Sequence, residues 1–351
     1  MRRQSKTVKI GDVVIGDGAP IAVQSMTRTL TRNVDETVEE IKKLEKAGCH
    51  IVRVAVTDEK DAKAITDIKK QISIPLVADI HFNYKLALLS IEAGADKIRI
   101  NPGNIGSEEK IKEIVSACKE RKIPIRIGIN SGSLEKEILQ RYKHVTPEAL
   151  LESALKNIKL LERMNFTDIV ISVKSTSVPK TIDAYRLLAK KVRYPLHVGI
   201  TESGFPRIGI VRSAVGLGIL LHEGIGDTLR VSLTASPEEE VRVGLEILKS
   251  LELLDQGITI ISCPTCGRCE IDVKAIAEEI EEKTRRIMLP LRVAIMGCEV
   301  NGPGEAADAD VGVAGGRGVG LIFREGQVVR KVPESEMVEA LLDEIESMAI
   351  K

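Results

Sequence analysis

From residue 20 to residue 233 the sequence repeats one unit, in which a short run of β-branched residues and a turn precede a segment with helical apolar spacing. Segment 34–47 is typical of the helical part, because Val38, Ile41 and Leu44 recur every three residues and Gly48 follows its end. The pattern predicts strands at residues 21–25, 51–56, 76–80, 97–101, 125–129, 169–173, 196–200 and 229–233. It predicts helices at residues 34–47, 61–70, 84–93, 108–121, 148–164, 180–190, 209–221 and 238–253.

This alternation predicts an α/β fold. Eight strand-helix units in about 235 residues fit a closed (β/α)8 TIM barrel better than an open doubly wound sheet, although the strand count alone leaves the open sheet as an alternative. After Gly257 the strand-helix repeat ends, and the remaining pattern predicts a small α/β domain. Its predicted elements are strands at 258–262 and 292–296, a helix at 272–287, a Gly-rich turn at 315–320, a hairpin through Glu325 and Gly326, and a helix from Pro333. We therefore predict two domains, residues 1–256 and 257–351, with a linker at 254–257.

Composition narrows the class of protein. The chain has 351 residues, 51 Lys and Arg residues balance 51 Asp and Glu residues, and 2% of the residues are aromatic. A neutral chain so poor in aromatic residues argues against a nucleic-acid-binding protein. Arg2 and Arg3 precede a polar segment rather than the apolar core of a signal peptide, and no apolar run approaches the ~18 residues of a membrane span. We expect a cytoplasmic protein that binds neither nucleic acid nor membrane.

The predicted strands carry polar residues on one face. Strands of a parallel sheet are usually apolar on both faces, but in segment 97–101 Ile98 and Ile100 alternate with Lys97, Arg99 and Asn101. The apolar face must meet the outer helices, so the polar face points into the barrel. The same alternation selects Arg53, Asp79, His81, Arg126, Asn130, Ser172, Lys174, His197, Arg230 and Ser232 as candidate site residues.

These side chains predict a cationic pocket. Six cations share this face with two carboxylates, Asp79 and Glu202, and because unpaired charges are costly in a packed core we expect them to gather at the C-terminal mouth of the barrel. Guanidinium groups bind phosphate oxygens bidentately, so the expected ligand is a small multiple anion such as a diphosphate. Some of the cations could instead be salt-bridged core residues. Asp79 and His81 could form an acid/base pair or a structural one.

Four of the six cysteines lie in the C-terminal domain. Cys263 and Cys266 follow the strand at 258–262, Cys269 comes three residues later, and Cys298 follows the strand at 292–296. Thiolates suit zinc or an iron-sulfur cluster, but a zinc ribbon would need a second, separate CxxC motif, whereas Cys298 stands alone and no histidine lies in this domain to replace it. A cuboidal cluster with three cysteines and one other ligand fits better. Spacing alone does not choose between Cys269 and Cys298 as the third thiolate.

Seven motifs occur in order along nearly the whole chain. They are Val23-Gln-Ser-Met-Thr27, Ala78-Asp-Ile-His-Phe82, Lys97-Ile-Arg-Ile-Asn-Pro-Gly-Asn-Ile105, Gly199-Ile-Thr-Glu202, Gly224-Ile-Gly-Asp-Thr-Leu-Arg-Val-Ser232, Cys263-Pro-Thr-Cys-Gly-Arg268 and Met296-Gly-Cys-Glu-Val-Asn-Gly-Pro-Gly-Glu-Ala306. With these motifs the chain resembles the 4-hydroxy-3-methylbut-2-enyl diphosphate synthases of the non-mevalonate isoprenoid pathway, in their bacterial two-domain form.

The resemblance implies a TIM barrel followed by an iron-sulfur domain similar to those of sulfite and nitrite reductases. It implies a 4Fe-4S cluster held by Cys263, Cys266, Cys298 and Glu305, and it leaves Cys269 as an extra thiol that could become a rescue ligand or an oxidation site. The family's reaction opens 2-C-methyl-D-erythritol 2,4-cyclodiphosphate and removes a hydroxyl, consuming two electrons and two protons. Its product is 4-hydroxy-3-methylbut-2-enyl diphosphate, an isoprenoid precursor.

On this interpretation the barrel cations hold the cyclic diphosphate and stabilise the departing phosphate. Glu305 binds the unique iron less tightly than a thiolate would, so it can yield to a substrate oxygen. Glu202 is the candidate proton donor, and flavodoxin or ferredoxin is the expected electron donor. The eighth helix ends at the rim opposite the mouth, so the family's head-to-tail homodimer would place one chain's cluster domain over the other chain's barrel.

Two other interpretations stay open on the residues alone. The barrel could belong to a phosphosugar aldolase or isomerase with a structural zinc in the small domain, or the chain could be a non-catalytic iron-sulfur redox protein. A radical enzyme that uses adenosylmethionine is disfavoured because the motif CxxxCxxC is absent.

Overall fold

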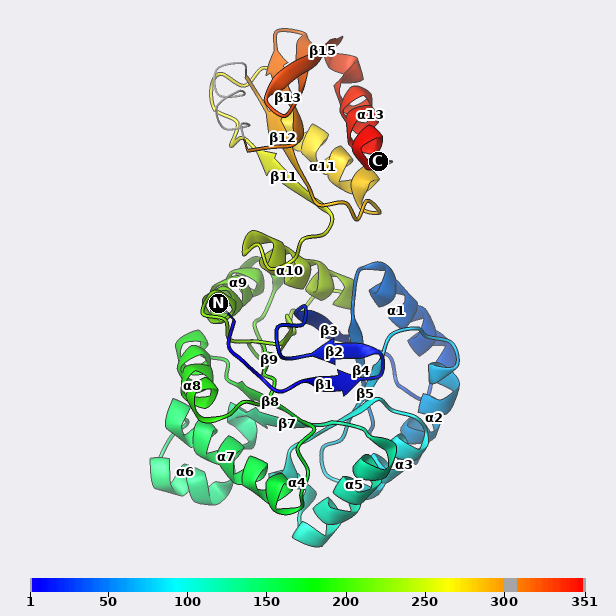
Figure 1. The fold of residues 1–351 in the computed structure, drawn as a ribbon, viewed down its shortest axis with the longest axis vertical. Coiled ribbons are helices and arrows are strands. Elements are labelled where there is room, and N and C mark those ends of the chain that lie inside the picture. The colour runs from blue at the N-terminus through cyan, green and yellow to red at the C-terminus, as the bar shows by residue number, and fades with distance from the viewer. Residues whose placement is uncertain (1, 299–307, 350–351) are drawn as a thin grey trace. The chain divides into compact units, whose positions relative to one another are not determined.

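The computed structural model describes residues 2–298 and 308–349. The chain forms two compact units, Met1–Leu254 and Asp255–Lys351. The first runs from blue to yellow-green in Figure 1 and the second from yellow to red. Each unit has its own hydrophobic core.

The first unit contains, within residues 2–254, a ring of eight parallel strands surrounded by helices (Figure 1). The strands are β3 (Ala22–Met26), β4 (Ile51–Ala55), β5 (Leu76–Asp79), β6 (Lys97–Ile100), β7 (Ile125–Asn130), β8 (Ile169–Lys174), β9 (His197–Val198) and β10 (Thr228–Leu229). Neighbours pair in chain order and β10 pairs with β3. A parallel bridge between Ile171 and Leu196 joins β8 to β9, so the ring closes. The predicted TIM barrel is confirmed, and the open sheet is excluded.

The outer layer contains a counterpart of every predicted barrel helix. These are α1 (Val34–Lys46), α2 (Glu59–Lys69), α3 (Tyr84–Glu92), α5 (Glu108–Arg121), α7 (Pro147–Arg163), α8 (Val178–Lys191), α9 (Pro206–His222) and α10 (Pro237–Ser250). Their apolar faces and the outward isoleucines of the strands, such as Ile98 and Ile100, form the main core. Three shorter elements were not predicted, namely α4 (Pro102–Ile105), the 3-10 helix η1 (Ser131–Ser133) and α6 (Lys136–Tyr142).

The last two barrel strands are shorter than predicted. β9 and β10 have two residues each, whereas five were expected at 196–200 and at 229–233. The reason lies at Gly199, where a Cβ atom would come 2.6 Å from the carbonyl oxygen of Arg230. The backbone segments that follow β9 and β10 approach each other too closely there for residues with side chains to continue a regular pair of strands.

An N-terminal hairpin that the sequence pattern did not predict closes one end of the barrel. It consists of β1 (Val8–Ile10) and β2 (Val13–Ile15) and lies across the ring in Figure 1. Its apolar side chains form one buried cluster with Ala22, Ile51, Val77 and Val170, which stand at the beginnings of their strands. The hairpin therefore forms a floor at the N-terminal ends of the strands. Strands of three residues show too little alternation to be recognised in a mixed polar segment.

The second unit is a mixed sheet covered by helices. Its strand order within the described residues is β11 (Ile258–Ser262), β12 (Leu291–Met296), β13 (Val311–Gly316), β14 (Val319–Arg324) and β15 (Gln327–Pro333), with the first three parallel. α11 (Val273–Thr284) and α13 (Met337–Ala349) supply apolar side chains to its core. The hairpin through Glu325 and Gly326 is confirmed.

Two predicted details of the second unit are wrong. The Gly-rich segment is not simply a turn, because Gly315 and Gly320 pair across β13 and β14, where a Cβ would strike Ile271 or Met337. The last helix begins at Met337, after the 3-10 helix η2 (Glu334–Glu336), rather than at Pro333.

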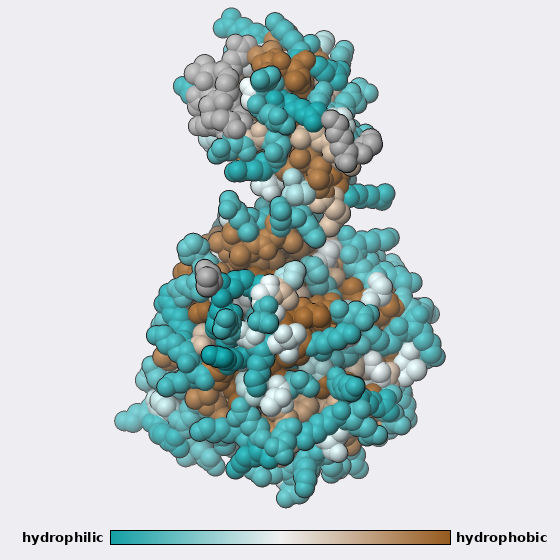
Figure 2. All heavy atoms as spheres, viewed as in Figure 1, coloured by the Kyte–Doolittle hydropathy of each residue, from teal (hydrophilic) through white to brown (hydrophobic). Residues whose placement is uncertain are grey.

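Hydrophilic side chains cover most of the visible surface, and hydrophobic ones are visible around α9 and α10 and in parts of the second unit (Figure 2). On α9, Ile208, Val211, Val215 and Ile219 are exposed and follow one another at helical spacing. Among the described residues no helix combines the length and the apolar character needed to cross a membrane.

Candidate active site

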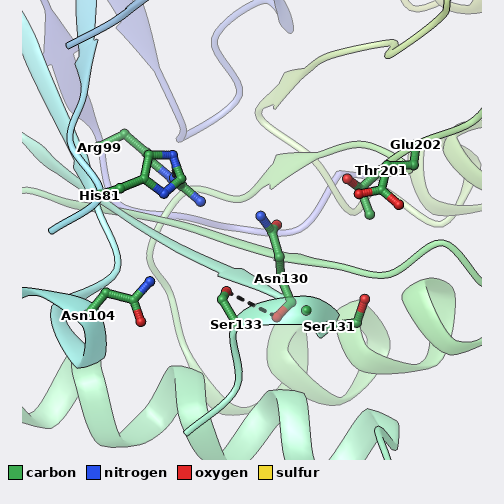
Figure 3. A pocket seen from close by; sticks show the side chains of 9 residues that line it. His81, Arg99, Asn104, Asn130, Ser131, Ser133, Thr201 and Glu202 are labelled. Carbon is green, nitrogen blue, oxygen red and sulfur yellow. Dashed lines mark hydrogen bonds between the residues drawn. The ribbon is translucent and has the colours of Figure 1, made fainter. Parts of the chain in front are cut away.

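A cavity of about 220 Å³ opens at the C-terminal ends of the barrel strands (Figure 3). His81 and Arg99 lie on one wall, Thr201 and Glu202 lie on another, and Asn130 projects between them. Asn104 and residues 131–133 complete the lining. Active sites of TIM barrels lie at this end of the strands, so the cavity marks the candidate site.

Asp79 organises the cationic wall of this site. Arg99 Nη1 donates to Asp79 Oδ1 at 2.9 Å, and Arg53 Nε lies 3.7 Å from Oδ2. Burial opposes ionisation of Asp79, but Arg53, His81 and Arg99 together hold its pKa well below the usual range. His81 Nε2 is 3.2 Å from Arg99 Nη1 and 3.7 Å from Asp79 Oδ2. Of the two predicted roles for Asp79 and His81, this geometry favours the structural pair, with a permanent carboxylate that orients guanidinium groups.

A second buried carboxylate was missed by the sequence analysis. Glu240, from α10, is 3% exposed and its Oε2 atom lies 3.3 Å from Arg230 Nη2. It resembled an ordinary acidic residue in the first turn of a helix, and no sequence signal distinguished it.

Met26 was also missed, although it lies on the polar face of β3. Its Sδ accepts a hydrogen bond from Arg53 Nε at 3.1 Å. Burial lowers the pKa of Arg53 to about 9.

The cations extend deeper into the barrel than predicted. Lys97 stands in register with Val77, and Arg126 in register with Val170, at the level of the apolar residues that meet the hairpin floor. Lys97 is 0% exposed and Arg126 is 1% exposed. The prediction that the charges gather toward the mouth therefore fits Arg99 but not Lys97 and Arg126, which stand near the beginnings of β6 and β7. The interior tolerates these residues because its centre is lined by polar side chains rather than filled by apolar ones.

Many polar atoms of this deep layer have no hydrogen-bond partner among the described residues. They are Lys97 Nζ, Arg126 Nε and Nη1, His197 Nε2 and both amide atoms of Gln24. His197 is otherwise fixed, since its Nδ1 lies 2.8 Å from Thr228 Oγ1. Buried polar groups in native proteins are almost always satisfied, so these atoms indicate a place for water or for an anionic ligand.

The electrostatics of the interior favour an anion. Burial, followed by the repulsion of neighbouring cations, lowers the pKa of Lys97, Arg126, Lys174 and His197 well below the ordinary values. A bound polyanion would supply the missing opposite charge and reverse these shifts. Lys174 reaches across to the end of the neighbouring strand β9, where a Cβ atom at Gly199 would be 2.8 Å from its Nζ.

The remaining predicted residues fall around the same interior. The Asn101 amide accepts from the Gly103 N–H and donates to the Ser133 carbonyl, each at 3.2 Å, so it ties α4 to η1. Ser172 is buried in β8 beside Gly128, and Ser232 is half-buried beyond β10. Glu202 is exposed at the cavity and has a φ of +52°. A non-glycine residue in this region is uncommon, and such residues cluster at functional sites.

The predicted thiol ligands follow adjacent parallel strands of the second unit. Ser262 and Ile295 are in register, so Cys263 and Cys298 come shortly after the same edge of the sheet. The Gly297 N–H donates to Cys263 Sγ at 3.2 Å, and Cys266 is exposed. Three soft sulfur donors near one edge fit the chemistry of an iron-sulfur cluster. Glu305 lies outside the described residues, and within these residues no three His, Cys, Asp or Glu side chains are placed to share a single metal ion.

Comparisons with known proteins agree with both units. Residues 5–245 match the family model of the GcpE TIM-barrel domain, and residues 259–347 match that of the GcpE protein C-terminal domain. The chain belongs to the GcpE family. The family resemblance predicted from the seven motifs is confirmed.

Relatives of this GcpE-family chain are similar along its whole length. It is 60% identical, over 99% of its length and 98% of the relative, to 4-hydroxy-3-methylbut-2-en-1-yl diphosphate synthase (flavodoxin) of Caldanaerobacter subterraneus subsp. tengcongensis. It is 56% identical, over 99% of both chains, to the protein of the same name from Geobacter sulfurreducens. A dihydropteroate synthase structure from Stenotrophomonas maltophilia covers 71% of this chain and 97% of its own, with a TM-score of 0.53 and 12% identity. That likeness shows the barrel fold alone.

Gly128 provides a test of how the GcpE-family barrel positions Arg99. A Cβ at this position would lie no more than 3.0 Å from Nε, Nη2 and Cζ of the Arg99 guanidinium. Gly128→Ala should therefore push Arg99 away from Asp79 and lower kcat/KM about 10- to 100-fold. Steady-state kinetics measure the loss. Gly132→Ala is the matched control, because Gly132 lines the same cavity with no described atom within 4 Å of its Cβ position. Equal kinetics for the two variants would contradict this role.

Proposed function

We propose that this chain is a 4-hydroxy-3-methylbut-2-en-1-yl diphosphate synthase. It would open the ring of 2-C-methyl-D-erythritol 2,4-cyclodiphosphate and remove one hydroxyl, with two electrons and two protons consumed. The observation that carries the proposal is the cationic interior of the barrel in a chain with no net charge. The names of the relatives support the same reaction.

The substrate diphosphate would bind among the barrel cations. Arg53 and Arg99, held by Asp79, would contact it from one side, and Lys174 and Arg230 from the other. Phosphate oxygens would accept from the guanidinium and ammonium groups that now lack acceptors among the described residues, those of Arg126 and Lys97. The polar side chains of His81, Asn101, Asn130, Ser172, His197 and Ser232 would orient the rest of the molecule. When the ring ester breaks, the same cations stabilise the charge that develops on the departing phosphate.

Cys263, Cys266 and Cys298, with Glu305 as a fourth ligand, would hold a 4Fe-4S cluster in the second unit. When bound, such a cluster supplies electrons one at a time and can act as a Lewis acid toward a hydroxyl oxygen. The Gly297 N–H that points at Cys263 Sγ would stabilise the thiolate form required of a ligand.

Glu202 would deliver a proton to the leaving hydroxyl. Its position on the cavity wall facing Arg99 and His81 supports this role, as does its exposure, which allows the carboxyl to be reprotonated from solvent. Its φ of +52° is a strained conformation for a residue other than glycine, and such conformations are typical of functional sites.

Flavodoxin is the proposed electron donor, because the names of the relatives include it.

We also propose a cytoplasmic head-to-tail homodimer, in which the partner's cluster domain covers the barrel mouth. Two observations support a dimer. The barrel unit ends after α10, and helices of a TIM barrel run back from the mouth toward the other end of the strands. The exposed apolar face of α9 is typical of a protein interface.

Anaerobic purification followed by an activity assay tests the proposed function. The protein should contain iron and inorganic sulfide in equal amounts, and its visible absorbance should bleach with dithionite. It should convert the cyclodiphosphate when supplied with reduced flavodoxin. One zinc per chain with no iron would favour the aldolase or isomerase alternative. A bleachable cluster without turnover would favour the redox carrier.

A further inference from the structure

Two cysteine sulfurs face the same empty position in the second unit. A Cβ atom at Gly297 would lie within 3.2 Å of the Sγ atoms of both Cys263 and Cys269, and 3.1 Å from Val273 Cγ2. Two atoms that close to one point are less than about 6.4 Å apart. The two thiols therefore lie close enough for a disulfide of about 2 Å to be considered between them rather than between distant parts of the chain.

The local hydrogen bonds bring these two cysteines together. The Cys263 N–H donates to the Ile295 carbonyl at 3.2 Å, and the Glu270 N–H donates to the Gly297 carbonyl at 2.8 Å. The chain thus contacts β12 as it leaves β11 and returns beside the end of β12 seven residues later, at Glu270. Both sulfurs also pack against the apolar core of this unit, whereas Cys266, between them in sequence, is exposed.

Cys269 has no role in the proposed cluster site. Its Sγ–H donates to the Ile271 carbonyl at 3.1 Å, which holds the sulfur near Gly297. The CxxC pair of Cys263 and Cys266 has the shorter sequence separation, but the sulfurs among the three atoms nearest to the Cβ position of Gly297 are those of Cys263 and Cys269.

We propose that Cys263 and Cys269 form a reversible disulfide when the cluster is lost under oxidising conditions. The inference rests on the proposed function in that Cys263 is a cluster ligand there. With hydrogen peroxide as the oxidant, one thiol attacks a peroxide oxygen and gives a sulfenic acid and water. The second thiol then attacks that sulfur, forms the S–S bond and releases another water. Two electrons pass from the sulfurs to the peroxide.

The disulfide would protect a ligand of the cluster from irreversible damage. A lone sulfenic acid at Cys263 can proceed to sulfinic acid, which thiols do not reduce, whereas a disulfide is reopened by a dithiol. Cys269 would thereby keep cluster-free protein competent for cluster reassembly after reduction.

Mass mapping of the cluster-free full-length chain tests the proposal. The protein is treated with hydrogen peroxide, its remaining thiols are alkylated, and its peptides are analysed without reduction. The expected result is the loss of two alkylatable thiols per chain, mapped to a Cys263–Cys269 disulfide, and their recovery with dithiothreitol. A predominant Cys263–Cys266 or Cys266–Cys298 disulfide, or no disulfide, would overturn the proposal.

Two serine variants sharpen the test. Cys269→Ser should lose the disulfide and accumulate Cys263 sulfinic acid, and it should regain less visible absorbance than the wild type when iron, sulfide and dithiothreitol are added after peroxide. Cys266→Ser, the matched control for mapping, should still form Cys263–Cys269. Equal recovery of absorbance by the wild type and Cys269→Ser would overturn the protective role. The mapping uses cluster-free protein, so its outcome is independent of whether the loaded enzyme turns over the cyclodiphosphate.

Discussion

Arg126→Met is expected to lower kcat/KM for the cyclodiphosphate about 10²- to 10³-fold and, at the same time, to stabilise the fold by about 1–3 kcal/mol. Arg126 is 1% exposed, and two of its guanidinium nitrogens have no acceptor among the described residues. Its charge therefore destabilises the free protein, and only an anionic ligand offsets that cost. Anaerobic steady-state kinetics measure the first effect, and thermal unfolding without ligand measures the second.

Arg163→Met is the control for this prediction. Arg163 is exposed on α7, with its Nη2 3.0 Å from Glu108 Oε1, so its loss should change stability by less than about 1 kcal/mol and leave the kinetics unchanged. An Arg126→Met protein that unfolds more easily than the wild type, or one that keeps full activity, would show that Arg126 is a structural residue.

Cys298→Ala should abolish both visible absorbance and turnover in anaerobically purified protein. Removing one of three thiolate ligands leaves the proposed cluster without a full set of ligands, and an incomplete set no longer binds the cluster tightly. The barrel has its own core, so far-ultraviolet circular dichroism and the binding of the cyclodiphosphate should both persist. Iron analysis and absorption spectra provide the direct measurement.

Cys118→Ala separates ligand loss from the loss of a thiol in general. Cys118 is a fully buried residue of α5 whose thiol pKa is raised by burial to about 12, which is typical of a structural cysteine. This variant should retain the absorbance, with at most a modest loss of stability. Retention of the absorbance by Cys298→Ala would remove Cys298 from the ligand set.

Much of the barrel could be predicted because its pattern departs from the usual one. Ordinary parallel strands are apolar on both faces, so the alternation of Lys97 and Arg99 with Ile98 and Ile100 identified an interior that had to be polar. The eight strand-helix repeats predicted the barrel, and the motifs predicted the family. The closed ring depends on the contact of β8 with β9, which no local pattern encodes.

Other parts of the site were hidden because they depend on tertiary placement. Glu240 becomes an interior carboxylate only because α10 turns it toward Arg230. The depth of Lys97 and Arg126 depends on where the hairpin floor lies, and the hairpin strands are too short to be recognised. Sequence spacing made Cys263 and Cys266 the obvious pair, whereas the proximity of Cys269 to Cys263 follows from the return of the chain to Gly297.

The hairpin of β1 and β2 closes the N-terminal end of the barrel as the described residues form it, so the cavity at the C-terminal end is the route of entry. Since Val8, Ile10 and Ile15 seal the other end with apolar contacts, a molecule that enters the barrel must leave by the route it came. Substrate, product and exchanging water would then compete for one passage. A slow-leaving product would block the next turnover, and inhibition by product should be competitive with the substrate.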